Sequence, residues 1–266
     1  MATDWNPAQY QRFATQRAQP FWDLVELIHR GAIERAVDLG CGTGDLTVSA
    51  AERLGIGHMT GIDSSPAMLE QAEQHGRVHV AFEYGDIARW TSDGDHDLVL
   101  ANAALQWVPD HQAVLERWIA ALAPEGQLAV QVPANHDHPS HLASSHVSHQ
   151  EPFASAFDGE PPPDPTAVNV LAPEQYATLL HELGVREPHV RLQVYPHLFE
   201  RSADVVEWTK GTSLTRFFRR LPAELHDPFV DAYREELLDR IGRVEPYFYA
   251  FKRILIWGRV SRTDAR

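Results

Sequence analysis

The chain has little cysteine and almost no lysine. Cys41 is the only cysteine among 266 residues, so no internal disulfide can form and a reducing compartment is expected. Lys210 and Lys252 are the only lysines among 23 basic residues, and we attribute the surplus of surface arginines to codon bias. No apolar run reaches the roughly 18 residues of a membrane span, and the first residues lack a signal-peptide pattern. We therefore expect a cytoplasmic protein without a membrane partner.

An excess of positive charge is also lacking. The formal net charge is −14 at pH 7, and a field of that sign repels polyanions. We expect no nucleic-acid partner, although a local basic pocket is compatible with this total. The length and the hydrophobic content of 44% fit one large α/β domain or two small ones. The oligomeric state is left open, with a monomer slightly favoured.

Short apolar runs alternate with helical patterns along the first half of the chain. Such alternation is typical of βαβ units and a parallel sheet. The predicted strands cover residues 35–39, 58–62, 78–82, 97–101 and 127–132. The predicted helices cover residues 20–30, 45–54, 65–75 and 110–122. The third of these helices opens with Ser64 or Ser65 as a cap and Pro66 in its first turn.

The residue composition of the sequence changes after Val132. Residues 133–166 are rich in His, Ser and Pro and predict one short helix and a loop. The remaining patterns predict a helix over 172–184, a strand near 189–195, helices within 202–243 and a strand over 252–260. A helical block between the last two strands predicts a cap over the carboxyl edge of the sheet, where open α/β sheets bind ligands.

The stretch AVDLGCGTGDLT, residues 36–47, joins a predicted strand to a predicted helix through three glycines. At such a turn, backbone N–H groups and a helix N-terminus can meet a polar ligand. A phosphate-binding loop is excluded because no lysine follows the last glycine. A dinucleotide-binding motif, G-x-G-x-x-G, is disfavoured because Asp45 occupies the position of its third glycine. The Asp45 carboxylate would also repel a pyrophosphate. An NAD-dependent oxidoreductase is therefore a distant alternative.

Two further acids follow the next predicted strands. Asp63 ends the second strand, where a carboxylate can accept hydrogen bonds from ribose hydroxyls. Asp86 follows the third strand, and Ile87 beside it can pack against a flat ring. S-adenosylmethionine, a nucleoside with an amino-acid tail, fits these residues because its ammonium and sulfonium charges are compatible with Asp38 and the acids around it.

These motifs resemble those of the class I S-adenosylmethionine-dependent methyltransferases: DLGCGTG, the acid after the second strand, GD-I after the third and an Asn after the fourth. The resemblance implies an α/β, Rossmann-like fold with a seven-stranded, mostly parallel sheet and helices on both faces. It also implies an N-terminal lid helix and a helical cap between the last two strands. The expected parts are lid and lead-in helices (1–34), a cofactor-binding core (35–200), a cap (201–250) and a final strand with the tail (251–266).

A closer resemblance covers nearly the whole chain and is strongest over residues 4–133. The segments DWNPAQYQRFATQRAQPFWDL, GIDSSPAML, ANAALQWVPDH and LAPEGQLAVQVP are similar to segments of bacterial trans-aconitate 2-methyltransferases. This likeness implies methyl-ester formation on one carboxylate of trans-aconitate or a similar small polycarboxylate. Direct SN2 transfer needs no general base, because a carboxylate is already ionised at neutral pH.

The resemblance also implies which residues hold the cofactor. The residues expected beside the methionine portion are Asp38, Gly40, Gly42, Gly44, Asn102 and Ala103, and Gln106 is expected to face the methyl group or the substrate. The residues expected around the adenosine are Asp63, Ser64, Met68, Asp86 and Ile87, with Arg17 closing from the N-terminal lid.

A tricarboxylate substrate also needs side chains that hold its unreacting carboxylates, and bidentate arginines suit this task. The residues expected to position the substrate are Tyr10, Trp107, His141, His197, Trp208, Arg216 and Arg253. Of the two arginines, Arg253 lies in an AF-x-R segment that matches the family, whereas Arg216 has no firm counterpart. No residue is expected to act as a catalytic acid or base.

The five histidines within residues 136–149 raise the question of a metal site. No cysteine or helical i, i+4 pair frames them, and carboxylate methylation needs no Lewis acid, so we expect no metal. Two alternative functions stay open. One is another small-molecule or malonyl-carrier-protein carboxyl methyltransferase of the same fold, a group that shares the QW after the fourth strand. The other is a non-catalytic S-adenosylmethionine-binding regulatory protein.

Overall fold

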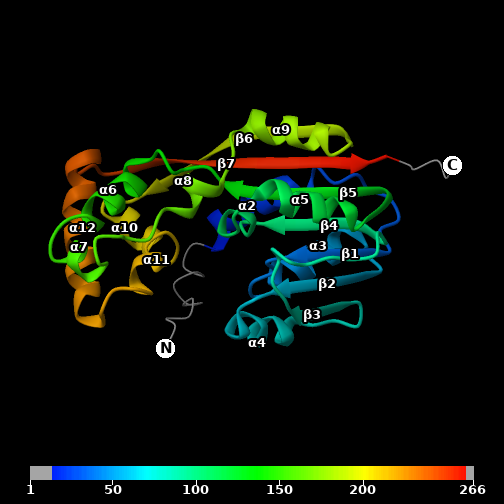
Figure 1. Cartoon of the computed structure of the whole chain (residues 1–266), viewed down its shortest axis with the longest axis horizontal. Coiled ribbons are helices and arrows are strands. Elements are labelled where there is room, and N and C mark those ends of the chain that lie inside the picture. Colours follow the sequence, from blue (N-terminus) through cyan, green and yellow to red (C-terminus); the bar gives the residue numbers. More distant parts are fainter. Residues whose placement is uncertain (1–13, 262–266) are drawn as a thin grey trace. The chain divides into compact units, whose positions relative to one another are not determined.

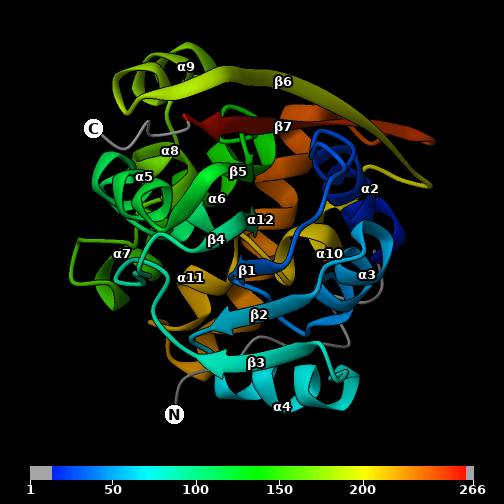
Figure 2. The ribbon, with the colours of Figure 1, turned by 90° about the vertical axis from the view of Figure 1, so that its right-hand side faces the viewer.

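The computed structural model describes residues 14–261, with side chains from residue 18 onward. Seven strands form one sheet in the order β3-β2-β1-β4-β5-β7-β6 (Figure 2). The strands are β1 (Arg35–Leu39), β2 (His58–Asp63), β3 (Val80–Tyr84), β4 (His96–Asn102), β5 (Leu122–Pro133), β6 (Val185–Phe199) and β7 (Tyr247–Val260). The Rossmann-like α/β fold predicted from the sequence is confirmed.

The pairing of the strands sets where a ligand can bind. β1 runs parallel to β2 and to β4, β2 parallel to β3, and β4 parallel to β5, whereas β7 is antiparallel to β5. The chain order reverses between β1 and β4, because β2 and β3 lie on one side of β1 and β4 and β5 on the other. Open sheets of this kind bind ligands outside the carboxyl ends of the strands at such a switch point.

The chain divides into two compact units. The α/β unit comprises Arg17–Pro133, Asn169–Gln193 and the chain from Arg253 onward. Its helices are α2 (Ala14–Val25), α3 (Asp45–Leu54), α4 (Pro66–His75), η1 (Leu105–Trp107), α5 (His111–Ala120) and α9 (Pro173–Glu182). Helices α5 and α9 lie on the opposite side of the sheet from α2 and α3 (Figure 2). Each helix turns an apolar face inward, as α5 does with its buried Val114, Leu115 and Trp118.

Among the described residues, the helical unit comprises Ala134–Val168 and Val194–Lys252 together with residues 14–16 of α2. Its helices are α6 (Pro139–Ser148), α7 (Phe153–Ala156), α8 (Pro165–Asn169, of which Asn169 falls in the α/β unit), α10 (Asp204–Lys210), α11 (Thr215–Phe218), η2 (Ala223–Leu225) and α12 (His226–Ile241) (Figure 1). The Phe229 ring of α12 packs on Phe217 and Phe153, with ring centroids 4.8 and 5.1 Å apart. These buried rings give the unit its own apolar core.

Helices α3 and α4 begin where local signals place them. α3 covers the predicted residues, and α4 starts at Pro66 with Ser65 as its cap, whose hydroxyl accepts a hydrogen bond from the Met68 N–H at 3.4 Å. Strand β3 begins two residues later than predicted. A tight turn pairs Arg77 with Val80 and leaves Val78 fully exposed, so Val78 is excluded from the strand.

Residues 133–166 differ most from the prediction. The sequence predicts one short helix there, but the structure has α6, α7 and the start of α8. His138 caps α6 with its side chain and Pro139 opens that helix, a use of His and Pro that composition alone does not indicate. These residues cluster with residues 194–252, whereas the predicted division assigned them to the α/β core. The last strand, β7, also begins earlier than expected.

No helix of the described residues is long and apolar enough to cross a membrane.

Candidate functional site

The turn between β1 and α3 lies at the switch point of the sheet. Gly40, Gly42 and Gly44 all have positive φ angles, of 86°, 56° and 76°. The Gly40 N–H donates a 2.7 Å hydrogen bond to the Ile62 carbonyl at the end of β2, which ties the turn to the neighbouring strand. The turn is therefore held by backbone geometry that side chains rarely adopt.

Gly42 and Gly44 face different surroundings. A Cβ atom at Gly44 would lie 2.5 Å from the Phe82 ring, so that glycine is needed for packing. A Cβ atom at Gly42 would meet no atom of the described residues within 4 Å. The Gly42 backbone thus borders open space, where a ligand can approach the main chain closely.

Asp38, the fourth residue of β1, is buried and only half satisfied. One of its oxygens, Oδ2, accepts a 2.6 Å hydrogen bond from the Thr47 hydroxyl. The other, Oδ1, is buried and has no hydrogen-bond partner among the described residues. The pKa of Asp38 is raised to about 7, because burial and, to a smaller extent, the charge of Asp63 outweigh the Thr47 hydrogen bond, which lowers it. A cationic ligand group would satisfy Oδ1 and stabilise the carboxylate.

Asp63 ends β2 and supports the same turn. Its Oδ2 accepts a hydrogen bond from the Gly42 N–H and its Oδ1 one from the Ser65 N–H, both at 2.9 Å. These two bonds fix the carboxylate beside the glycine turn and the start of α4. Because each carboxylate oxygen has two acceptor sites, the half-buried Asp63 can still accept hydrogen bonds from two ligand hydroxyls.

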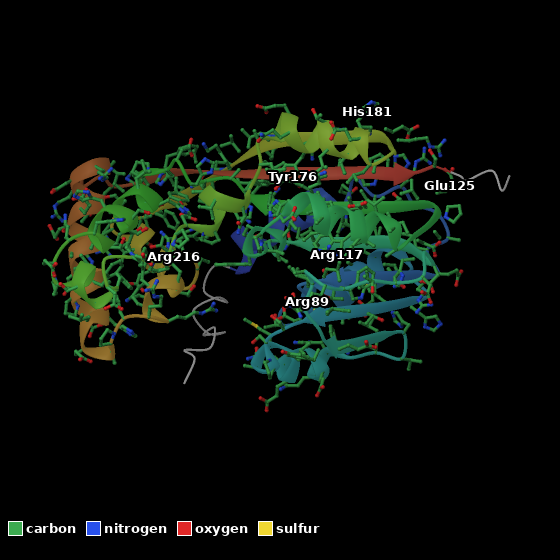
Figure 3. The ribbon with its side chains drawn as sticks, in the orientation of Figure 1. Arg89, Arg117, Glu125, Tyr176, His181 and Arg216 are labelled. Atoms are coloured by element: carbon green, nitrogen blue, oxygen red, sulfur yellow. The ribbon has the colours of Figure 1, made fainter. Side chains whose placement is uncertain are left out.

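The loop after β3 carries the next predicted residues. Asp86 is exposed, and its Oδ1 accepts a hydrogen bond from the Ala88 N–H at 2.9 Å. Helix α5, which carries Arg117 (Figure 3), anchors this loop. Trp118 donates to the Ile87 carbonyl at 3.0 Å, and Arg117 donates to the Ala88 carbonyl at 2.6 Å. Ile87 is half-buried, so its side chain is available to a flat ring.

Met68 in α4 is buried and Ser64 before it is exposed. Both lie in the β2–α4 connection with Asp63, as the predicted adenosine contacts require. Whether they contact the adenosine stays a prediction.

The end of β4 supplies further unsatisfied acceptors. The Asn102 side-chain oxygen is buried and has no hydrogen-bond partner among the described residues. Gln106 donates a 2.6 Å hydrogen bond to the Ala103 carbonyl, and its own Oε1 is likewise buried without a partner in that part of the chain. Ala103 has a φ of 52°, a conformation rare for a residue with a side chain.

Together with Asp38 Oδ1, these oxygens make the switch point rich in buried acceptors. Buried acceptors without partners are rare in proteins. They fit a ligand that donates hydrogen bonds and carries positive charge, and they do not fit a phosphate. The ammonium and sulfonium groups of S-adenosylmethionine meet this requirement.

Trp107 follows at the end of η1 and is 40% exposed. His111 holds η1 in place, because its ring nitrogens contact the Leu105 carbonyl at 2.9 Å and the Tyr176 hydroxyl at 2.7 Å. This Trp is free to contact a substrate, and its predicted role stays a prediction.

Arg253 of β7 is a buried cation in the same unit. It lies opposite Pro133 of β5, and its Nη1 donates a 3.5 Å hydrogen bond to the side-chain oxygen of Gln131. Gln131 in turn pairs in register with Asn102 of β4. The half-buried Asn102 and the buried Gln131 and Arg253 thus follow one another on three adjacent strands near the ends of β4 and β5. A carboxylate could be held by this row.

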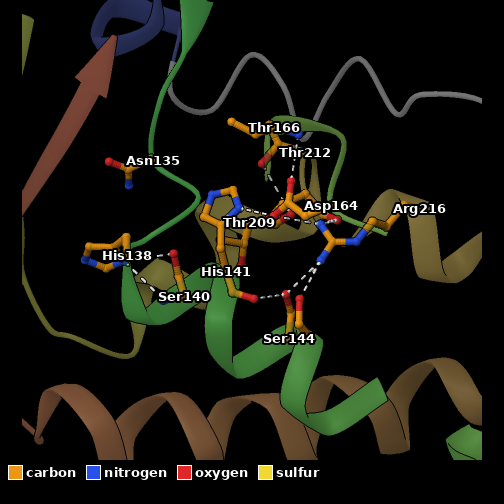
Figure 4. A network of polar contacts seen from close by, with 12 residues as sticks. Asn135, His138, Ser140, His141, Ser144, Asp164, Thr166, Thr209, Thr212 and Arg216 are labelled. Carbon is orange, nitrogen blue, oxygen red and sulfur yellow. Dashed lines mark hydrogen bonds and ion pairs between the residues drawn. The ribbon is translucent and has the colours of Figure 1, made fainter. Parts of the chain in front are cut away.

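His141 and Arg216 meet within the helical unit, joined by a residue that was not predicted. Asp164 Oδ2 lies 2.5 Å from His141 Nδ1 and 3.3 Å from Arg216 Nη1 (Figure 4). Its Oδ1 accepts a hydrogen bond from the Thr166 N–H at 2.9 Å. Burial alone would raise the pKa of Asp164, but the hydrogen bond and charge of His141 and the charge of Arg216 hold it well below its usual range.

His197 and Trp208 pack together in the helical unit. Their ring centroids are 4.9 Å apart, and both rings also lie against Tyr249 and Phe251. Both side chains are more than nine-tenths buried. A packing role is thus evident for each, and the expected substrate contact stays a prediction.

Two predicted lid residues are not described. Tyr10 lies outside the described residues, and the side chain of Arg17 does too.

No group of three or more His, Cys, Asp or Glu side chains that could hold a metal was found among the described residues. Within the histidine-rich segment, His138 caps α6 through a 3.1 Å hydrogen bond from the Ser140 N–H, and burial lowers its pKa to about 4. His141 binds Asp164. These two histidines therefore have structural partners.

Sequence reasoning missed three residues of these networks. Thr47 lies in the first turn of α3, nine positions after Asp38, and a hydroxyl that close to a glycine turn could have been noticed. Gln131 alternates with apolar residues in β5, so a polar residue in a buried run was a usable signal. Asp164 lies between prolines, and that sequence context indicates a loop residue without a functional role.

Comparison with known proteins agrees with this geometry. Residues 32–180 match a family model described as a methyltransferase domain. The chain is 39% identical to a trans-aconitate 2-methyltransferase of Deinococcus radiodurans, over 94% of this chain and 96% of that protein. It is 36% identical to one of Variovorax paradoxus, over 97% and 96%.

Among solved structures, the YcgJ protein of Bacillus subtilis has a TM-score of 0.61 at 15% identity and covers 91% of this chain and 98% of its own. A Haemonchus contortus phosphoethanolamine N-methyltransferase, solved with S-adenosylhomocysteine, has a TM-score of 0.56 at 16% identity and covers 91% and 52%. These structures share the fold. The relatives and the family model establish that the chain is an S-adenosylmethionine-dependent methyltransferase and belongs to the trans-aconitate 2-methyltransferase family.

Proposed function

We propose that this chain transfers a methyl group from S-adenosylmethionine to one carboxylate of trans-aconitate, forming a methyl ester. The observation that carries the proposal is the extent of the likeness to proteins named trans-aconitate 2-methyltransferase. It spans 94% or more of this chain in two of them, well beyond the 32–180 methyltransferase domain. The likeness therefore extends well beyond the methyltransferase domain, into the parts of the chain where we expect substrate contacts.

The bound cofactor supplies an electrophilic methyl group on a positively charged sulfur. In this chain, Asp38 Oδ1 and the Asn102 oxygen would accept hydrogen bonds from the ammonium end of the cofactor. Asp63 would hold the ribose hydroxyls, and Asp86 with Ile87 would border the adenine. Asp38, Asn102 and Asp63 stand at the carboxyl ends of β1, β4 and β2, so the sheet itself sets their spacing.

The acceptor needs no deprotonation, because a carboxylate with a pKa near 4 is ionised at neutral pH. The task of the chain is to align the carboxylate oxygen with the methyl group and to exclude water. Arg253, held by Gln131 on β5, would bind a carboxylate that does not react. Trp107, exposed after β4, would cover the reacting end.

The other predicted positioning residues are Tyr10, His141, His197, Trp208 and Arg216. His141 and Arg216 are already bonded to Asp164, so they would act on the substrate as part of that network. A cytoplasmic location is part of the proposal, since the single cysteine fits a reducing compartment.

The test is turnover with a panel of acceptors. We expect methyl-ester formation with trans-aconitate to exceed that with cis-aconitate, citrate, isocitrate and malonyl carrier protein, measured by mass spectrometry of the products. Methylation of malonyl carrier protein alone would replace the small-molecule substrate with a protein one. Binding of S-adenosylmethionine without transfer to any acid would favour a regulatory protein.

A pair of variants tests the carboxylate contact. Arg253→Leu is expected to raise the KM for trans-aconitate at least tenfold, since charge-assisted hydrogen bonds contribute about 1.5–3 kcal/mol. Arg259→Leu is the matched control, because Arg259 lies on the same strand but forms an ion pair with Glu187 at 2.7 Å. An equal effect of both variants would contradict the assignment of Arg253.

A further inference from the structure

The two carboxylate oxygens of Asp38 differ in their hydrogen bonding. Oδ2 is bonded to the Thr47 hydroxyl at 2.6 Å, and Oδ1 has no hydrogen-bond partner among the described residues. Asp38 is 3% exposed and Thr47 is 0% exposed. Because Oδ2 already accepts a hydrogen bond, the buried Asp38 carboxylate can accept one from a ligand through Oδ1.

The position of Thr47 follows from the helix that carries it. Asp45 begins α3, so Thr47 lies in the first turn of the helix, directly after the glycine turn. A β-branched side chain has few rotamers in a helix, and a helical threonine commonly bonds to a carbonyl of the preceding turn. Here the hydroxyl reaches Asp38 of the neighbouring strand instead. The Thr47 hydroxyl therefore donates its hydrogen bond to the Asp38 carboxylate and not to a backbone carbonyl of its own helix.

The charges around Asp38 oppose its ionisation. Burial has the largest effect and raises the pKa of Asp38 to about 7, and the negative charge of Asp63 raises it as well. Cys41, in the glycine turn, is the other titratable group that faces Asp38, and the Asp38 charge helps to raise the pKa of its thiol. Thr47 acts in the opposite direction, because its hydrogen bond favours the charged carboxylate.

We propose that Thr47 is a positioning residue for the cofactor: its hydrogen bond to Oδ2 orients Asp38 and favours the charged carboxylate, and it leaves Oδ1 to accept a hydrogen bond from a cationic ligand group. Asp38 contacts the ligand, and Thr47 acts through Asp38. The inference rests on the cofactor site of the proposed function and is independent of the identity of the methyl acceptor.

The first experiment measures the ionisation of Asp38 without any ligand. Aspartate carboxyl ¹³C NMR follows the titration in wild type, Thr47→Val and Thr47→Ser, and Asp38→Asn identifies the resonance. We expect the midpoint to rise by about one pH unit in Thr47→Val, since a hydrogen bond to a charged group contributes about that much. Thr47→Ser keeps the hydroxyl and is expected to retain the wild-type midpoint.

The second experiment measures S-adenosylhomocysteine affinity by calorimetry at pH 6, where its ammonium group is fully charged. We expect an about tenfold loss in Thr47→Val, because the ionised fraction of Asp38 falls by that factor, and near-complete recovery in Thr47→Ser. The matched control is Thr209→Val, which removes an equally buried threonine hydroxyl in the helical unit. It should leave both the affinity and the Asp38 midpoint unchanged.

An unchanged Asp38 midpoint in Thr47→Val would overturn the proposal, as would equal losses of affinity in the valine and serine variants. Should Thr47→Val not fold, Thr47→Cys replaces the hydroxyl with a weaker donor and is expected to raise the midpoint by a smaller amount. If wild type binds S-adenosylhomocysteine but does not methylate trans-aconitate, only the proposed substrate fails. If turnover stands but the midpoint does not move, only the role of Thr47 fails.

Discussion

At the scale of single residues, the glycines of the β1–α3 turn have different surroundings, which the sequence motif alone does not reveal. Gly44 is confined by the Phe82 ring, whereas Gly42 borders open space and donates its N–H to Asp63. One glycine therefore serves packing and the other serves approach to the main chain. We therefore expect Gly44 to matter for stability and Gly42 to matter for binding, although the two glycines are only two positions apart.

Alanine substitutions test this separation. Gly44→Ala is expected to destabilise the protein by about 2–4 kcal/mol, because a positive φ and an overpacked Cβ both add strain. Gly42→Ala is expected to cost only about 1 kcal/mol of stability but to weaken S-adenosylhomocysteine binding. Denaturant unfolding and calorimetry measure the two effects. Equal loss of stability in both variants would contradict the distinction.

Asp63 is the residue on which the nucleoside assignment depends. Asp63→Ala removes two acceptors of the turn and the expected acceptor of the ribose hydroxyls. We expect S-adenosylhomocysteine affinity to fall about a hundredfold, from the loss of charge-assisted hydrogen bonds.

A 2′,3′-dideoxy analogue of the ligand separates these effects. It should bind wild type less tightly than the parent does, whereas Asp63→Ala should bind both equally. If the variant still distinguishes the two ligands, Asp63 does not hold the sugar.

At the scale of elements, Asp164 joins three segments of the helical unit. It bonds to His141 of α6, to Arg216 of α11 and to the backbone at the start of α8. All three side chains are buried. Removing the central carboxylate would leave two buried basic groups facing each other, which is more costly than the loss of a surface ion pair.

Asp164→Asn is expected to destabilise the protein by about 3–5 kcal/mol at pH 7. The folded-state pKa of Asp164 is lowered, so its stabilising effect is present above the unfolded value near 4 and is lost as the pH falls below it. Wild type should therefore lose stability between about pH 5 and pH 3 more steeply than the variant does. Urea unfolding across that range measures the difference. Parallel curves would show that Asp164 is not the titrating group.

At the scale of the whole molecule, the net charge of −14 acts on every charged ligand. It attracts the cationic cofactor and repels an anionic substrate before any local contact forms. The arginines and histidines that would bind carboxylates must therefore create a locally positive potential within the negative electrostatic field of the whole chain.

Salt is expected to change the two association rates in opposite directions. From 20 to 200 mM NaCl, screening should slow association of S-adenosylmethionine and raise kcat/KM for trans-aconitate, each by a few fold. The product S-adenosylhomocysteine, with no net charge, is the control and should change little. Stopped-flow binding and initial rates provide the measurements. A fall in kcat/KM with salt would mean that a local basic surface governs substrate entry.

Local signals were sufficient for the elements nearest the glycine turn. β1 and α3 have the predicted bounds, because an apolar run, positive-φ glycines and an acidic helix start act over a few residues. The positions of Asp38, Asp63 and Asp86 at or just beyond the carboxyl ends of strands could be predicted for the same reason, and their contacts with the cofactor stay a prediction. Residues 133–166 could not, because their short helices depend on contacts with segments far along the chain.

The sequence by itself determined the α/β class, the parallel strands and the acids at their carboxyl ends, because each is written in residues adjacent along the chain. Only the tertiary structure decided that one Asp38 oxygen has no hydrogen-bond partner among the described residues and that His141 and Arg216 meet through Asp164. His141 and Asp164 lie 23 positions apart in the sequence. Hydrogen bonds and burial depend on distances in space, and those exist only once the strands and helices have packed.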